Sequence, residues 1–259
     1  MPRFAANLSL MFNEVDFLTR FNAAAAVGFK GAEFQFPYDY PVAEIAARRA
    51  ESGLTVALFN APPGHYAQGE RGIAGIPGRE AEFEAGIVSA LAYCAALDCR
   101  RLHVMAGLIQ HGANRLTLVS NLRRAASRAA AAGVELLIEP INNRDIPGYL
   151  INRTAEAMAI IGQVGDPQVK LQFDLYHRQI MEGDLVAALR QYLPYAAHVQ
   201  IAQPPDRGEP DRGEIDYRFI FQMLDALDYA GWVGCEYRPR GDTVTGLVWL
   251  ADLGVRVDG

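Results

Sequence analysis

Strand-like runs alternate with helical runs along the whole sequence, and this alternation limits the fold more than any other feature. Such an order is typical of a parallel sheet that is built from βα units. We expect strands near residues 3–9, 31–36, 55–60, 101–106, 134–139, 169–174, 196–201 and 232–237. We expect helices near residues 16–27, 43–51, 80–97, 116–132, 154–164, 185–192 and 219–229.

The number of βα units distinguishes between the two common parallel architectures. Eight units favour a closed (β/α)8 barrel, because a doubly wound sheet usually carries a glycine-rich turn after its first strand and none is present here. The length of 259 residues agrees with the roughly 250 residues that are typical of such a barrel. No linker rich in Pro or Ser divides the chain. We therefore predict an α/β fold and a single domain, a TIM barrel over residues 1–259.

Composition and charge argue against several function classes. Hydrophobic residues make up 51% and charged residues 21%, which suits a large buried core and not disorder. The formal net charge of −6 argues against nucleic acid as the main partner, because phosphate binding needs a concentrated basic surface. No apolar run is long enough to span a membrane. The three cysteines lack paired or metal-type spacing and the N-terminal segment lacks a secretory signal, so we expect reduced thiols and a cytoplasmic protein.

Four of the expected strands end on a side chain that carries oxygen. These side chains are Glu139, Asp174, Gln200 and Glu236. In a parallel barrel the carboxyl ends of the strands meet at one face, where such barrels carry their chemistry. Three carboxylates and an amide would be expensive to bury together unless a positive group lies among them. We therefore predict one divalent metal ion that is held by all four residues.

The ligand set and the two glutamates suggest a reaction. Hard ions such as Mg²⁺ or Mn²⁺ prefer oxygen ligands, whereas a tight Zn²⁺ site more often recruits His or Cys. Such an ion would polarise a carbonyl and a hydroxyl on adjacent carbons and acidify the carbon-bound proton. The ends of the fifth and eighth strands face each other across the barrel mouth, so Glu139 and Glu236 are the expected catalytic pair that removes and returns this proton. A salt bridge or a helix cap is the structural alternative for either residue taken singly.

Three further residues are predicted to bind substrate. His177, three residues after Asp174, is placed to hydrogen-bond a substrate oxygen or to shuttle a proton; as a lone histidine its alternative role is structural. Arg207 lies in a charged loop, where its two-nitrogen fork would hold a substrate carboxylate. Asp145 would contact a substrate hydroxyl or shape the turn before Pro147.

Three other polar residues are left out of the predicted site. Glu33 lies in the middle of a strand, and His103 on the fourth strand is expected to pack inside the barrel. Arg212 is expected to belong to a solvated charge run. The two longest irregular segments, 61–79 and 202–216, follow the third and seventh strands and would cover the same face as the metal site, as lids or as solvated loops.

Eight segments run in register from the first expected strand to the eighth: residues 4–9 (FAANLS), 69–72 (GERG), 76–80 (IPGRE), 138–142 (IEPIN), 173–177 (FDLYH), 198–202 (HVQIA), 207–210 (RGEP) and 234–237 (GCEY). They closely resemble the hydroxypyruvate isomerase family, which belongs to the xylose-isomerase-like barrels. The resemblance implies a (β/α)8 fold and an aldose-ketose type isomerase that converts hydroxypyruvate reversibly to 2-hydroxy-3-oxopropanoate (tartronate semialdehyde). The family's catalytic glutamates fall on Glu139 and Glu236, and its metal positions on those two residues, Asp174 and Gln200. Many relatives in the wider group carry His where this chain has Gln200.

The resemblance leaves other substrates open. A related branch, the 2-oxotetronate isomerases, is similar in its opening segment and in residues 103–107 (HVMAG) and 197–202 (AHVQIA). Its four-carbon 2-oxo acids need the same proton transfer between adjacent carbons. A ketose 3-epimerase, from the same wider group, is a further alternative.

Two other protein classes are more remote alternatives. An apurinic-site endonuclease of related fold depends on a His-rich cluster of several metals, whereas this chain has five histidines, of which only His177 falls at a proposed site. A non-catalytic barrel that binds sugar acids would gain little from two opposed carboxylates. The expected partner is therefore a small 2-oxo or hydroxy acid, with neither nucleic acid nor a membrane, and a homo-oligomer is left open.

Overall fold

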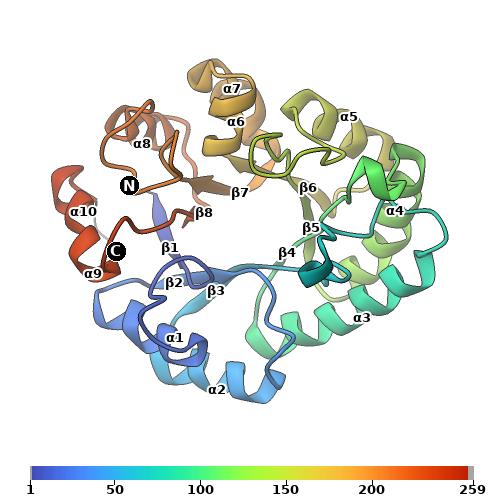
Figure 1. The fold of residues 1–259 in the computed structure, drawn as a ribbon, viewed down its shortest axis with the longest axis horizontal. Helices are drawn as coiled ribbons and strands as arrows, with labels where there is room; N and C mark the ends of the chain where they lie inside the picture. Colours follow the sequence, from blue (N-terminus) through green and yellow to red (C-terminus); the bar gives the residue numbers. More distant parts are fainter. Residues whose placement is uncertain (1, 256–259) are drawn as a thin grey trace.

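A closed barrel of eight parallel strands forms the centre of the protein. The structure is a computed structural model that describes residues 2–255. Each strand pairs with its neighbours in the chain, and β1 also pairs with β8, which closes the ring. The helices form an outer layer around the strands (Figure 1). The predicted (β/α)8 TIM barrel is therefore confirmed.

The strands are short and begin close to the expected positions. They are β1 Arg3–Asn7, β2 Gly31–Phe34, β3 Thr55–Asn60, β4 Arg101–His103, β5 Glu135–Ile138, β6 Val169–Asp174, β7 Ala196–Ile201 and β8 Trp232–Cys235. Several end earlier than expected, because the chain leaves the sheet to build loops over one end of the barrel. As a result Glu139 and Glu236 each lie one residue beyond a strand, at the rim of the barrel.

Within residues 2–255 the seven expected helices are present, together with three additional short ones. The helices are α1 Phe17–Ala26, α2 Val42–Ser52, α3 Glu80–Leu97, α4 Arg115–Ala131, α5 Thr154–Val164, α6 Leu175–Met181, α7 Leu185–Tyr192, α8 Tyr217–Ala226, α9 Thr243–Gly246 and α10 Val248–Asp252. The additional helices α6, α9 and α10 are too short to show a helical period in the sequence. Helix α6 begins directly after Asp174, because the Asp174 carboxylate accepts the backbone N–H groups of Tyr176 and His177 and so caps a helix. Within residues 2–255, no helix combines the length and the apolar character that crossing a bilayer requires.

Apolar residues at helical spacing attach the outer helices to the barrel. The buried residues of α8 are Tyr217, Ile220, Phe221 and Leu224. They share one face of the helix, and Phe221 contacts Phe4 of β1 with ring centroids 5.1 Å apart. Burial of each such side chain contributes about 1.5–3 kcal/mol. This packing fixes where the strand ends lie and hence where the side chains of the site converge.

The two long irregular segments both lie over the C-terminal ends of the strands. Segment 61–79 is hydrogen-bonded to the barrel, since the Ala61 N–H donates to the His103 carbonyl of β4 at 2.8 Å. Segment 202–216 carries Arg207. Side chains from both segments line one cavity, so they cover the end of the barrel that was expected.

Candidate active site

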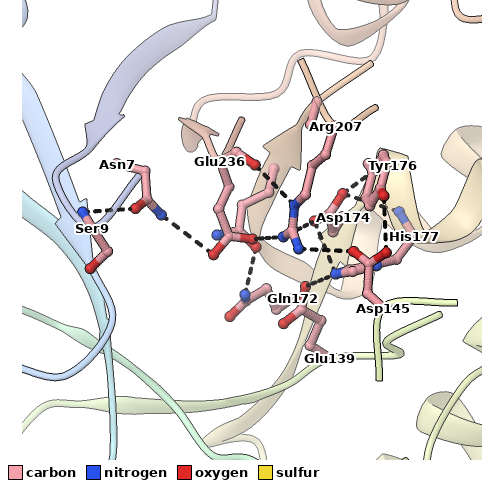
Figure 2. Close-up of polar contacts among 12 residues, drawn as sticks. Asn7, Ser9, Glu139, Asp145, Gln172, Asp174, Tyr176, His177, Arg207 and Glu236 are labelled. Atoms are coloured by element: carbon pink, nitrogen blue, oxygen red, sulfur yellow. Dashed lines mark hydrogen bonds and ion pairs between the residues drawn. The ribbon is translucent and has the colours of Figure 1, made fainter. Parts of the chain in front are cut away.

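The C-terminal end of the barrel gathers charged side chains from separate elements. Glu139 lies one residue after β5, Asp174 ends β6 and Glu236 follows β8, while His177 lies in the first turn of α6. One ligand atom from each of these four residues lies within 4.8 Å of the other three. All four side chains are buried. Figure 2 shows them directed toward one another.

Two carboxylate oxygens of this cluster are buried without a hydrogen bond. Glu139 Oε1 and Asp174 Oδ2 form none with any described residue. His177 Nε2 lies 3.7 Å from the first oxygen and 3.6 Å from the second, which is too long for a hydrogen bond. Arg207 Nη2 lies 3.9 Å from Asp174 Oδ2, but one guanidinium balances only one of the three carboxylates. The cluster therefore fits a divalent metal ion.

The hydrogen bonds behind His177 determine which ring nitrogen carries the proton. The Asp145 N–H donates to Asn142 Oδ1 at 2.7 Å, so the amide nitrogen of Asn142 faces His177 Nδ1 at 2.6 Å. Nδ1 must then accept, which leaves the proton on Nε2. Burial lowers the pKa of His177 well below its usual value, so the ring is neutral. An Nε2–H group beside Glu139 and Asp174 suits a hydrogen-bond donor better than a metal ligand.

Arg207 is a partly buried cation among these carboxylates. Its Nη2 lies 2.6 Å from Glu236 Oε2, and its Nη1 lies 3.1 Å from Asp145 Oδ2. Its Nε donates to the backbone oxygen of Glu236 at 3.3 Å. The guanidinium also lies over the ring of Tyr176, 5.0 Å from its centre. All three nitrogens are thus engaged within the protein, as Figure 2 shows, and two predicted substrate-binding residues pair with each other.

Burial raises the proton affinity of the three carboxyl groups. Burial raises the pKa of Glu139 well above its usual value, and the charges of Glu236 and Asp174 add to the effect. Burial also raises the pKa of Asp174 to about 7, although the Arg207 guanidinium opposes the shift. The pKa of Glu236 is raised by burial against the same opposition. Carboxyl groups with raised pKa values bind a proton more readily and can act as acids as well as bases.

Gln200, the fourth predicted metal ligand, lies on β7. Its Oε1 accepts from Gln172 Nε2 at 2.6 Å, and its Nε2 donates to Glu33 Oε1 at 2.9 Å. Both ends of the amide therefore have partners in the protein. An amide oxygen has two lone pairs, so one remains for a cation, and the ligand role of Gln200 stays a prediction.

Glu33 was left out of the predicted site, yet the structure connects it to the site. Its Oε2 lies 2.5 Å from His198 Nε2, and its Oε1 accepts from Asn7 Nδ2 at 2.8 Å. The same Asn7 nitrogen lies 3.4 Å from Glu236 Oε1. Gly234 makes room for this carboxylate, since a Cβ there would lie 2.0 Å from Glu33 Oε2. Two sequence features could have indicated this link: the carboxylate of Glu33 within an apolar strand and Gly234 in the last strand. Only the closed barrel brings these two residues together.

Three members of the cluster, Glu139, His177 and Glu236, line a cavity of about 230 Å³. This is below the roughly 300–1,000 Å³ of pockets for drug-sized ligands, so it suits a small substrate. His103 is buried, as predicted, but it also lines this cavity with its Nε2 3.5 Å from Glu139 Oε2. A larger cavity of about 570 Å³ lies at the opposite end of the barrel, among residues at the strand starts such as Arg101, Glu135 and Lys170. The chemistry-bearing cluster is in the smaller cavity.

Comparisons with known proteins agree with this fold. Residues 21–253 match the xylose isomerase-like TIM barrel family. The chain is 54% identical to a 2-oxo-tetronate isomerase from Cupriavidus necator, over 96% of this chain and 98% of the relative. It is 46% identical to a hydroxypyruvate isomerase from Escherichia coli, with the same coverage. A crystal structure described as an AP endonuclease, family 2, from Brucella melitensis has a TM-score of 0.95 and 50% identity, and covers 97% of this chain and 99% of its own.

These matches define the class of protein. The chain belongs to the xylose isomerase-like TIM barrel family. The curated relatives that it matches over nearly their full length are named as isomerases of small keto acids, and the chain is an enzyme of this isomerase group. The resemblance seen in the sequence segments is thereby confirmed.

Proposed function

We propose that the protein is a metal-dependent isomerase that interconverts hydroxypyruvate and 2-hydroxy-3-oxopropanoate. The observation that carries this proposal is the meeting of Glu139 and Glu236, from β5 and β8, in one buried cluster with raised pKa values. The 54% identity to a 2-oxo-tetronate isomerase favours a four-carbon 2-oxo acid as the second candidate substrate. Both acids carry a carbonyl next to a hydroxyl-bearing carbon.

The same cluster would hold the metal. Glu139, Asp174 and Glu236 would be its ligands, with Gln200 as the further predicted one. A bound divalent ion, with Mg²⁺ or Mn²⁺ as the expected identity, would supply Lewis-acid polarisation of the substrate's carbonyl and hydroxyl oxygens. The unpartnered buried oxygens of Glu139 and Asp174 support this assignment.

The two glutamates carry out the proton transfer. One carboxylate removes a proton from C3 of hydroxypyruvate, and the electron pair of that C–H bond becomes part of the C2–C3 double bond of an enediolate. The opposite carboxyl group returns a proton to C2. The proton of the C3 hydroxyl passes to the oxygen on C2, which leaves an aldehyde at C3. The raised pKa values of Glu139 and Glu236 favour this exchange of protons.

The predicted substrate-binding residues support this transfer. The His177 Nε2–H donates a hydrogen bond to the oxygen that gains charge in the enediolate. Arg207 holds the Glu236 carboxylate in place through Nη2 and offers its positive charge to the same region. Asp145 fixes Arg207 from the other side and lines the cavity, where it would meet a substrate hydroxyl.

A substrate panel tests the proposal. The protein is incubated in D₂O with hydroxypyruvate, 2-oxotetronates and common ketoses, in the presence of Mg²⁺, Mn²⁺ or EDTA. We expect turnover of a 2-oxo acid with deuterium incorporation at the exchanging carbon, and we expect EDTA to abolish both. Turnover of the four-carbon acids alone would select the second candidate. No turnover of any 2-oxo acid by metal-reconstituted protein would contradict the proposal.

The similar structure described as an AP endonuclease makes a nicking assay the necessary control. Within residues 2–255, the cluster that fits a metal contains a single histidine, His177, and the whole chain has a net charge of −6. Both features disfavour a multi-metal nuclease that binds DNA. We expect no nicking of an abasic duplex. Cleavage that Glu139→Gln abolished would replace the isomerase proposal with a nuclease.

A further inference from the structure

The proposed substrates carry a carboxylate, and the cavity that would receive them already holds carboxylates. Glu139 and Glu236 line it, Asp174 belongs to the same cluster, and Arg207 already commits all three guanidinium nitrogens to Glu236 and Asp145. Like charges repel strongly in a buried cavity. A further anion therefore needs a cation of its own.

Arg71 provides such a cation in the same cavity. It follows η1 (Tyr66–Gln68) in segment 61–79. Its Nη1 donates to the backbone oxygens of Tyr66 at 3.1 Å and of Glu70 at 2.7 Å. Among the described residues, its Nε and Nη2 have no hydrogen-bond partner. These two nitrogens share one edge of the guanidinium, and such an edge binds a carboxylate through two parallel hydrogen bonds.

Neighbouring side chains hold Arg71 in a fixed orientation. Its guanidinium carbon lies 4.0 Å from the centre of the Tyr66 ring, and Tyr66 in turn contacts Phe36 with ring centroids 5.0 Å apart. Glu70, the residue before Arg71, is anchored by an ion pair with Arg79. An arginine that is already ordered loses less conformational freedom when a ligand binds.

The backbone beside Arg71 packs closely against the barrel. Gly72 has a φ of +101°, and a Cβ at this position would lie 2.2 Å from the carbonyl oxygen of Met105. The Gly72 N–H also donates to the carbonyl of Pro63 at 2.9 Å. Only glycine permits this approach to the segment after β4. The loop therefore presents Arg71 at the wall of the cavity.

The geometry points to Arg71 as the residue that binds the carboxylate of the 2-oxo acid and so sets a preference for acids over neutral ketoses. This inference rests on the proposed function and names the part of the site that recognises the substrate class. The sequence predicted that Arg207 would hold this carboxylate. Arg71 binds the carboxylate instead, because its two-nitrogen edge is free. Arg207 remains beside the reacting carbons, where it pairs with Glu236 and Asp145.

Arg238 is the competing cation and serves as a matched control. It lines the same cavity, but it is exposed. Within the described part of the chain, no aromatic ring or carbonyl oxygen holds its guanidinium. Binding a carboxylate would therefore immobilise a long, free side chain, which opposes affinity. Replacing Arg238 removes the same charge from the same cavity as replacing Arg71.

Steady-state kinetics on an acid and its neutral counterpart test the inference. Arg71→Met, Arg71→Lys and Arg238→Met are compared with the unaltered holoenzyme on hydroxypyruvate and on dihydroxyacetone. We expect Arg71→Met to raise KM for hydroxypyruvate about 10- to 100-fold, the range for losing hydrogen bonds between charged groups, with a smaller change in kcat. The KM of Arg71→Lys for hydroxypyruvate should lie between those of the unaltered protein and Arg71→Met, because lysine keeps the charge but lacks the two-nitrogen edge. Kinetics on dihydroxyacetone should change far less.

Binding of an unreactive acid gives a readout without turnover. Glycerate has the same number of carbons as hydroxypyruvate and carries the carboxylate but no carbonyl, so calorimetric titration reports binding of the acid without turnover. We expect its affinity to fall in Arg71→Met by a factor similar to the rise in KM, and to be retained in Arg238→Met. Melting temperatures are measured in parallel to confirm that each variant is folded.

The outcomes separate this inference from the proposed function. If Arg71→Met keeps the ratio of kcat/KM between acid and neutral substrate, or if the loss falls on Arg238→Met instead, Arg71 is not the anchor and the isomerase remains. If Arg71→Met does not fold, an unchanged KM in folded Arg71→Lys overturns the inference equally. If the unaltered protein turns over no 2-oxo acid, the proposed function fails, and the glycerate titration still decides whether Arg71 binds a carboxylate.

Discussion

The two ends of the barrel both hold charged cavities, but the charges are paired differently. At the N-terminal end, Arg101 Nε and Glu135 Oε2 lie 3.9 Å apart, and their side chains are 23% and 34% exposed. At the C-terminal end, the side chains of Glu139 and Asp174 are 4% and 0% exposed and carry oxygens without a hydrogen bond. Arg101 Nε also lacks a hydrogen bond, but water can solvate the exposed parts of the Arg101–Glu135 pair. Oxygens without hydrogen bonds on almost fully buried carboxylates therefore mark the reactive end better than cavity volume, which is larger at the N-terminal end.

The largest expected effect comes from removing either catalytic carboxylate. Glu139→Gln or Glu236→Gln should lower kcat by about 10²- to 10⁴-fold, the contribution expected of a positioned acid or base. Deuterium exchange at the substrate carbon should fall by the same factor, with the melting temperature close to that of the unaltered protein. Glu135→Gln at the other end is the matched control and should retain activity. Near-normal turnover in either catalytic variant would show that another group moves the proton.

Metal removal should change stability in a pH-dependent way. Burial raises the pKa of Asp174 from 3.8 to about 7, so the folded protein holds a proton that the unfolded chain releases. The unfolding free energy of chelated protein should therefore fall as pH rises from about 4 to about 7. A bound cation would compensate the carboxylate charge, so the gain in melting temperature on adding Mn²⁺ should be larger at pH 8 than at pH 5. An equal gain at both pH values would argue against a cation among these carboxylates.

Much of the reactive end could be predicted because its signals are local. Alternating strand and helix patterns locate the eight βα units, and a residue at a strand end must lie at the rim of a parallel barrel. This reasoning brought Glu139, Asp174 and Glu236 together, and the structure places them in one cluster with His177. The ligand role of Gln200 depends on a cation and stays a prediction.

Features that depend on distant contacts could not be predicted. Glu33 joins Asn7 and His198 only because β1 lies between β2 and β8 in the closed ring. The free edge of Arg71 depends on how an irregular loop packs against an aromatic ring, which no sequence period encodes. Helix α6 was not predicted, because its N-terminal signal is Asp174, and an aspartate at that position is equally compatible with the end of a strand.

Arg207 should set the pH range of the reactive end. Its positive charge lowers the pKa values of Asp174 and Glu236 against burial, so Arg207→Gln should raise both. The acid limb of the kcat profile should then move to higher pH by about one unit or more. Arg240→Gln is the control, because Arg240 pairs with Asp211 on the surface of the same loop. A lower kcat with an unshifted profile would mean that Arg207 acts on the substrate alone.

A smaller effect on catalysis is expected from replacing Glu33, which lies on β2 below the rim of the barrel. Glu33→Gln keeps the side-chain volume but leaves the hydrogen bond to His198 without a carboxylate, so the unfolding free energy should fall by about 1–3 kcal/mol. Denaturant unfolding measures this change. The kcat should fall much less than in Glu139→Gln, since Glu33 touches Glu236 only through Asn7. A loss of kcat as large as that of Glu139→Gln would extend the catalytic set below the rim.

The smallest effect is expected at the N-terminal end, where Arg101→Gln removes one partner of the Arg101–Glu135 pair. Because the pair is partly exposed and its atoms are 3.9 Å apart, its loss should change the unfolding free energy by only about 0–1 kcal/mol. Both kcat and KM should stay close to those of the unaltered protein, because neither side chain reaches the C-terminal cavity. A marked fall in kcat with an unchanged melting temperature would instead couple the two ends through the strands β4 and β5 that carry this pair.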